Sequence, residues 1–245
     1  MQITYPNKNL LIDLKLKGIL TSYEVHLKNA HQHKWGYEEF LSILLQEEVG
    51  YKKNARVTVL LQKAGFKFQA SLEAFDWSLP RNLEKSLIQD LSTARFIEDG
   101  TNLIIQGPTG VGKSFLATAL GFAACRRSLS VRYFRMNDLI EQLTLARLKG
   151  AYSSFVKKIS SAQLIVLDDF GIKPLSPTQF QDFYDIIDER ANGQSTIITT
   201  QVPTKNWNDI ISDPVVCEAI SDRLVSKGIN IHMKGESYRK KKKDA

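Results

Sequence analysis

The chain lacks the features of a secreted or membrane protein. It has only two cysteines, Cys125 and Cys217, in 245 residues, which is too few for a disulfide framework. No apolar run approaches the roughly 20 residues that a membrane helix needs, and the first residues lack the apolar core of a secretory signal. We therefore expect a cytoplasmic protein with no membrane partner, in which both cysteines are reduced and buried.

The sequence also has no excess of acidic residues, and its formal net charge is +7. The last seven residues, from Arg239, contain five basic side chains and one acidic one, so much of the positive charge is concentrated there. A basic segment of this kind suits a polyanion, and inside a cell nucleic acid is the main one. The alternative is a solvated tail that only keeps the protein soluble.

A phosphate-binding loop is the strongest motif present. An apolar run at 103–105 precedes the pattern Gly-x4-Gly-Lys-Ser at 107–114, and helix-forming residues follow. In this strand–loop–helix context, glycines let backbone N–H groups point inward and the helix dipole adds positive potential. Lys113 is predicted to reach the β- and γ-phosphates of a nucleoside triphosphate, and Ser114 to hold Mg²⁺. The nucleotide contacts are expected from Gly107, Pro108, Thr109, Gly110, Val111, Gly112, Lys113, Ser114 and Phe115.

Two acids after an apolar strand form the expected companion of this loop. Asp168 and Asp169 directly follow the run Leu164–Leu167. Asp168 is predicted to hold Mg²⁺ opposite Ser114, and Asp169 to orient and deprotonate an attacking water. A residue that activates water favours nucleotide hydrolysis over a small-molecule phosphotransferase, because a phosphotransferase must keep water away from the phosphate.

Polar residues also end the next predicted strand, 195–200. Ligands of open α/β sheets lie beyond the carboxyl ends of the strands, so Thr200 or Gln201 is predicted to sense or position the lytic water, with Gln201 preferred. The alternative is ordinary capping of the strand end. Arg223, at the end of a predicted helix, and Arg239 are ordinary surface arginines when judged from the residues alone.

The order of predicted elements indicates an α/β fold. From residue 100, strands near 103–105, 131–134, 163–169 and 195–200 alternate with helices, which predicts a mainly parallel sheet with right-handed crossovers. We expect an ATPase domain at 71–245, preceded by a helical N-terminal domain at 1–70 for DNA, partner or oligomer contacts. Gly18 is a predicted helix stop in this domain, and Ser22 a predicted cap of the next helix.

A basic stripe is predicted on one helix of the N-terminal domain. Lys52, Lys53, Arg56 and Lys63 share an arc of about 100° at 3.6 residues per turn. Such a stripe suits a phosphate backbone, although Leu60 interrupts it. The alternative is a plain solvated helix face.

Taken together, the motifs resemble the IstB-like helper ATPases of bacterial insertion sequences, which are AAA+ proteins related to the DnaC-type helicase loaders. The resemblance covers nearly the whole chain. It rests on the linker at 72–77, the loop at 107–114, Leu-Asp-Asp-Phe-Gly at 167–171, and the segments at 195–201, 220–224 and 234–239.

The resemblance implies an α/β P-loop NTPase of AAA+ type, with a central parallel sheet preceded by a small all-helical domain. It implies an Mg²⁺-dependent ATPase that forms homo-oligomers on double-stranded DNA and assists the transposase of its insertion sequence in target selection. Arg223 matches the arginine finger that reaches the ATP of a neighbouring subunit, and Arg239 the second sensor arginine of the same subunit. Many AAA+ proteins carry glutamate where this chain has Asp169, so we expect slow hydrolysis.

The core motifs leave two relatives of this function open. One is a helicase loader similar to DnaC, with the same ATPase but a hexameric helicase as partner. The other is a DNA-binding module in which ATP only holds the oligomer together and is not hydrolysed.

Overall fold

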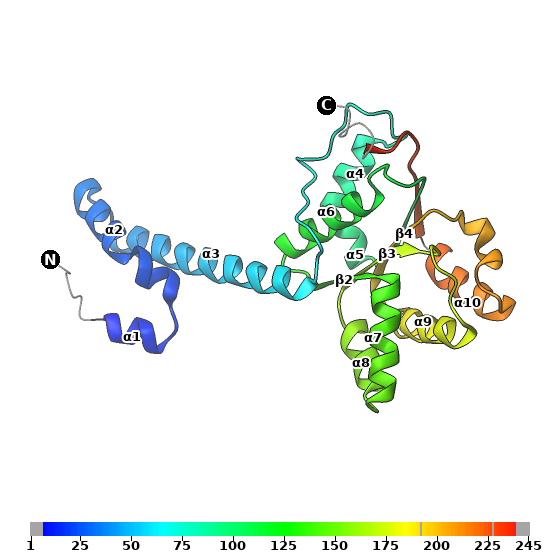
Figure 1. The fold of residues 1–245 in the computed structure, drawn as a ribbon. Coiled ribbons are helices and arrows are strands. Elements are labelled where there is room, and N and C mark those ends of the chain that lie inside the picture. Colours follow the sequence, from blue (N-terminus) through cyan, green and yellow to red (C-terminus); the bar gives the residue numbers. More distant parts are fainter. Residues whose placement is uncertain (1–6, 192, 227, 239–245) are drawn as a thin grey trace. The chain divides into compact units, whose positions relative to one another are not determined.

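Figure 1 shows the fold as a computed structural model, which describes residues 7–191, 193–226 and 228–238. The chain divides into two units, Met1–Val59 and Leu60–Ala245. This division differs from the expected one at residue 70 because it falls inside one long helix, whose last turn packs into the core of the second unit through Leu60, Leu61 and Ala64. Arg239 and the basic tail lie outside the described residues, so the predictions for them stay predictions.

The described part of the first unit contains α1 (Lys8–Asp13), α2 (Lys17–His33) and most of α3 (Tyr37–Ala64). Two details of the sequence prediction were wrong. Gly18 lies inside α2 and does not end a helix. Glycine is needed there because α3 passes so close that a Cβ at Gly18 would lie 2.6 Å from the Cα of Glu48. Ser22 is also inside α2, where its hydroxyl donates to the Gly18 carbonyl at 2.9 Å and caps nothing.

The first unit buries little of its apolar surface. Within its described part only Gly18, Ile19, Leu44 and Glu48 are buried, all at the crossing of α2 and α3, where the Glu48 carboxylate accepts the Ile19 N–H at 3.1 Å. Many large apolar side chains of this unit are exposed. Those exposed along α3 include Tyr37, Leu41, Leu45 and Val49.

A five-stranded parallel sheet forms the centre of the second unit. Its strands lie in the order β2-β3-β4-β1-β5, which confirms the predicted parallel α/β fold. The edge strand β5 was not predicted, because its five residues include glycine and asparagine and carry little apolar signal. The strands are β1 (Asn102–Gln106), β2 (Val131–Arg135), β3 (Leu164–Phe170), β4 (Ser195–Thr200) and β5 (Gly228–His232).

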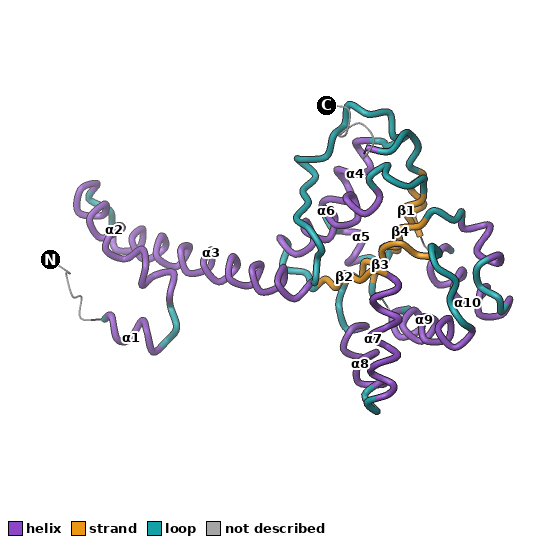
Figure 2. Tube along the Cα trace, viewed as in Figure 1, coloured by secondary structure: helices purple, strands orange, loops and turns teal. Residues whose placement is uncertain are grey.

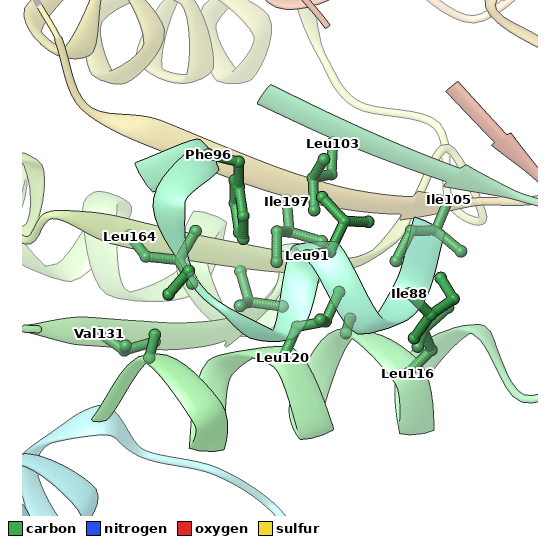
Figure 3. Close-up of a cluster of buried hydrophobic side chains, with 14 of the residues drawn as sticks. Ile88, Leu91, Phe96, Leu103, Ile105, Leu116, Leu120, Val131, Leu164 and Ile197 are labelled. Atoms are coloured by element: carbon green, nitrogen blue, oxygen red, sulfur yellow. The ribbon is translucent and has the colours of Figure 1, made fainter. Parts of the chain in front are cut away.

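Helices cover both faces of this sheet, with α4, α5 and α6 on one face and α7 to α10 on the other (Figures 1 and 2). In Figure 3, Leu116 and Leu120 of α6 and Leu91 of α4 pack with strand residues that include Leu103 and Ile197. The helices are α4 (Lys85–Ser92), α5 (Arg95–Glu98), α6 (Lys113–Arg126), α7 (Met136–Leu148), α8 (Tyr152–Ser160), α9 (Pro177–Arg190), the 3-10 helix η1 (Thr204–Asp209) and α10 (Pro214–Val225).

Both cysteines are buried, as predicted, and burial raises the pKa of the Cys125 thiol to about 12. Over the part of the chain that the structure describes, no helix combines the length and the apolar character needed to cross a membrane.

Candidate nucleotide-binding site

The predicted phosphate loop connects β1 to α6 at the carboxyl edge of the sheet. A segment near the C-terminus packs closely against it. A Cβ at Gly107 would lie 2.3 Å from the Met233 carbonyl oxygen, and one at Gly110 would lie 2.0 Å from the Ser237 hydroxyl oxygen. Gly110 has φ +83°, and its carbonyl accepts the Tyr238 N–H at 2.9 Å. These positions therefore need glycine for both backbone conformation and space.

Lys113 begins α6 and is buried, with an exposed fraction of 7%. Its Nζ donates to the carbonyl oxygens of Gly107 and Pro108, at 2.8 Å each. The ammonium group thus lies over the loop that it belongs to. A triphosphate bound in this loop would place negative charge beside a cation that is already desolvated, which strengthens their attraction.

Asp168 lies at the carboxyl end of β3 and is 2% exposed. Its Oδ2 accepts a hydrogen bond from the Tyr133 hydroxyl of β2 at 2.6 Å, and its Oδ1 accepts one from the Thr199 hydroxyl of β4. The two donors come from the strands on either side of β3, so the carboxylate is held from both neighbours. Burial, and then the charge of Asp168, raise the pKa of the Tyr133 phenol above its usual range, which keeps it a donor.

Strand alternation explains why these side chains meet. Residues two apart share a face of a strand, and Val131, Val166 and Ile197 belong to the core on the α6 face. Tyr133, Asp168 and Thr199 are each two residues further along their strands, and therefore face the side on which α6 and the phosphate loop lie.

The backbone is irregular at the two acids. The register between β3 and β4 pairs Leu167 with Ile198 and then Phe170 with Thr200, so Asp168 and Asp169 together oppose Thr199. This is a β-bulge, a feature that redirects side chains near functional sites. Asp169 has φ +65°, a left-handed conformation that aspartate tolerates better than most residues. Its N–H donates to the Thr199 hydroxyl oxygen at 3.0 Å.

The structure separates the two sensor candidates. The Thr200 hydroxyl donates to the Phe170 carbonyl at 2.9 Å and accepts the Val202 N–H at 3.0 Å, which is the strand-end capping that the sequence left open. The Gln201 Oε1 instead accepts a hydrogen bond from the hydroxyl of Thr109, in the phosphate loop, at 2.8 Å. The Thr200 main-chain carbonyl also accepts the Gly107 N–H of this loop at 3.2 Å, so the two candidates differ in what their side chains do: that of Gln201 bonds the phosphate loop and that of Thr200 caps its strand.

Arg223 lies away from the phosphate loop of its own subunit. Its guanidinium donates to Asp188 Oδ1 at 2.6 Å and to the Tyr184 hydroxyl at 3.2 Å, both on α9. Its main-chain carbonyl accepts from Asn102, at the amino end of β1, whereas the phosphate loop follows the carboxyl end of this strand. The sheet therefore separates Arg223 from the phosphate loop that it would need to reach within one subunit.

Sequence reasoning missed two residues of this site. Tyr133 was assigned only to a strand, and Thr199 was not given a role of its own. Neither belongs to a recognisable local motif, because each reaches Asp168 only after parallel strands pair across more than 30 residues of chain.

The donor set fits Mg²⁺ bound together with a nucleotide. The described residues contain no group of three or more His, Cys, Asp or Glu side chains that would hold a metal alone. Mg²⁺ in nucleotide sites takes one or two protein oxygens and completes its shell with phosphate oxygens and water. Ser114 and Asp168 supply oxygens of this kind, from the start of α6 and the end of β3.

Comparison with known proteins also points to an ATP-binding protein. The chain is 35% identical, over 97% of both chains, to a Sinorhizobium fredii protein named as an insertion sequence ATP-binding protein. A Mycobacterium tuberculosis protein with a similar name is 31% identical over 96% of this chain and 94% of its own. Among solved structures, a DnaC helicase loader superposes with a TM-score of 0.55 and 26% identity, over 67% of this chain and 97% of its own.

The fold is thus that of the AAA+ P-loop proteins. The sequence model of the IstB-like ATP binding protein family matches residues 9–245, nearly the whole chain. With the phosphate loop and the paired acids in place, the chain belongs to the family of IstB-like ATP-binding proteins encoded by insertion sequences.

Proposed function

We propose that this protein is an Mg²⁺-dependent ATPase that assembles on double-stranded DNA and assists the transposase of its insertion sequence. The observation that carries the ATPase proposal is the placement of Asp168 on the α6 face of the sheet, next to Asp169 at a bulge and at the same edge as Lys113. The names of the relatives support an insertion-sequence context.

Each side chain has a defined part in the proposed reaction. Lys113 binds the β- and γ-phosphates, and Ser114 and Asp168 hold Mg²⁺, which neutralises charge on the phosphates. Asp169 accepts the proton of the attacking water. Gln201, attached to Thr109 of the phosphate loop, orients that water near the γ-phosphate.

Arg223 is proposed to complete the site of a neighbouring subunit. Its position at the amino end of the sheet rules out its own phosphate loop as a target, and an arginine finger supplied in trans stabilises transition-state charge. ATP bound between subunits would link nucleotide binding to assembly. For Arg239, the proposed contact with ATP rests on the resemblance alone.

The DNA contact is proposed for the first unit, on exposed Lys52, Lys53 and Arg56 of α3. Lys52 lies 3.3 Å from Glu48, so part of its charge is offset within the helix. The exposed apolar side chains of the same helix suit contacts with other subunits or with the transposase. Likeness to the DnaC loader keeps a helicase as the alternative partner.

The first experiment measures ATP hydrolysis with and without double-stranded DNA. We expect DNA to stimulate the wild type, and Lys113→Ala to reduce both ATP binding and hydrolysis to background. Lys158→Ala removes an exposed lysine from α8 and serves as the matched control, with wild-type behaviour expected. A rate of hydrolysis that DNA does not change would contradict assembly on DNA. Transfer of phosphate to an acceptor other than water would contradict the proposed ATPase activity.

A mixing experiment tests the shared site. Arg223→Ala alone should lower hydrolysis by a factor of about 10³ or more. Mixed with inactive Lys113→Ala subunits, it should regain part of the wild-type rate, because Lys113→Ala subunits supply Arg223 to intact phosphate loops. Absence of recovery in oligomers shown to contain both variants would contradict a finger acting in trans.

A capture experiment tests the partner. Capture of transposase but not of a hexameric helicase would identify the transposase as the partner, and the reverse result would favour a helicase loader.

A further inference from the structure

We propose that Tyr133 is a positioning residue for magnesium, whose hydroxyl holds the Asp168 carboxylate in the orientation that receives the ion. This inference rests on the proposed function, because it assumes that Asp168 holds Mg²⁺ beside ATP. It goes beyond that function by assigning a role to a side chain on a neighbouring strand that belongs to no nucleotide-binding motif.

The contact is short and buried. The Tyr133 hydroxyl lies 2.6 Å from Asp168 Oδ2, and the exposed fractions of the two residues are 4% and 2%. Val166 of β3 pairs with Tyr133, so the phenol ring extends two residues beyond its register partner to reach Asp168. The long aromatic side chain spans this diagonal, as its hydrogen bond to Oδ2 shows.

The two hydroxyls bind different oxygens of the Asp168 carboxylate. Thr199 donates to Oδ1 and Tyr133 to Oδ2, so neither oxygen can rotate away without breaking a hydrogen bond. A carboxylate accepts about four hydrogen bonds, so each oxygen keeps the capacity to face a metal ion or its water. Outer partners that fix a metal ligand in this way commonly change metal affinity about 10–100-fold when removed.

The ring of Tyr133 is itself fixed. It packs with Phe66, centroid to centroid 6.0 Å, and Phe66 packs with Phe122 of α6 at 4.5 Å. The adjacent residue Arg132 donates to the carbonyl of Lys63 in the last turn of α3. Replacement of Tyr133 by phenylalanine therefore removes the hydroxyl from a ring that the surrounding side chains keep in place.

The chain offers a matched control on the opposite face of the sheet. The Tyr152 hydroxyl donates to Asp185 Oδ2 at 2.7 Å, between α8 and α9, and no proposed nucleotide residue takes part. Tyr152→Phe removes the same chemical group from the same kind of bond. A general effect of losing a tyrosine–aspartate hydrogen bond would appear in both variants.

The test measures binding of a non-hydrolysable fluorescent ATP analogue in saturating Mg²⁺ and in EDTA. For each variant, the ratio of the two affinities gives the gain in binding due to magnesium. Tyr133→Phe should lower this gain about tenfold while its affinity in EDTA stays within about twofold of wild type. Tyr152→Phe should match wild type in both conditions. In an Asp168→Asn background, Tyr133→Phe should have no further effect, because the carboxylate that it positions is gone.

Several outcomes would overturn the inference. They are an unchanged magnesium gain in Tyr133→Phe, an equal loss in Tyr152→Phe, and a loss of the fold in Tyr133→Phe alone, which would make the bond structural. Circular dichroism and thermal unfolding in EDTA monitor the fold. Failure of the proposed function is distinguishable, because Lys113→Ala would then bind the analogue as well as wild type.

Discussion

Two buried polar clusters lie at opposite ends of the same parallel sheet and differ in what holds them. At the carboxyl end, Asp168 is held by the side-chain hydroxyls of Tyr133 and Thr199. At the amino end, Arg190 donates mainly to main-chain carbonyls, at 2.9 Å to Ser160, at 2.7 Å to Ala162 and also to Ser195.

In the amino-end cluster, the guanidinium of Arg190 is already engaged by protein acceptors. Burial lowers the pKa of Arg190 to about 9, so the side chain is still charged at neutral pH. Its donors meet carbonyls at the end of α8, in the turn before β3 and at the start of β4. The Arg190 Nε also donates to the Thr196 hydroxyl oxygen at 3.3 Å. A cluster of this kind joins elements and leaves little capacity for a ligand.

The carboxyl-end cluster keeps capacity to bind. Each oxygen of Asp168 accepts from one hydroxyl and can accept more, and the adjacent Asp169 lies at a bulge with positive φ. Buried polar side chains alone therefore do not identify a functional site. The distinguishing features are acceptor capacity and irregular backbone at the edge where the phosphate loop lies.

The largest effect is expected from Asp169→Asn, which changes the carboxyl-end cluster and should lower hydrolysis. Removal of the proposed base should lower hydrolysis about 10²–10⁴-fold, while ATP binding and stability stay near wild type, because asparagine also tolerates positive φ. Single-turnover hydrolysis and analogue binding measure the two effects separately. Hydrolysis at the wild-type rate would remove Asp169 from the reaction and favour another group as the base.

A smaller effect, on stability alone, is expected from Arg190→Met. Three main-chain carbonyls lose a donor, and we expect the free energy of unfolding to fall by about 3 kcal/mol. Chemical denaturation measures this change. The magnesium gain in analogue binding should stay as in wild type. A selective loss of that gain in folded protein would show that the two ends of the sheet are coupled, which contradicts their separation.

The smallest effects are expected from replacing threonine by valine at either end of β4. Thr199→Val should lower hydrolysis about tenfold, because Asp168 loses a donor and the Asp169 N–H loses an acceptor. Thr196→Val should lower stability by about 1 kcal/mol without changing hydrolysis per folded molecule. Thr199→Ser retains the hydroxyl and should restore most of the rate. Equal effects on hydrolysis at both positions would erase the distinction between the clusters.

The sequence predicted the parts of the molecule that have local signals. The phosphate loop and the apolar strand before Asp168 were both found where their patterns place them. Predictions failed where a distant contact overrides the local signal. Gly18 is an example, because its small size serves the approach of α3 and not the end of a helix.

By itself, the sequence determined the fold class, the loop with Lys113, and the pair of acids, because each depends on residues that are neighbours along the chain. Only the tertiary structure decided that Tyr133 and Thr199 share Asp168, that the side chain of Gln201 and not that of Thr200 bonds the phosphate loop, and that Arg223 lies at the far end of the sheet. The physical reason is strand order. Parallel strands that are separated by helices in the sequence become neighbours only when the sheet forms, and local patterns do not specify which strands pair.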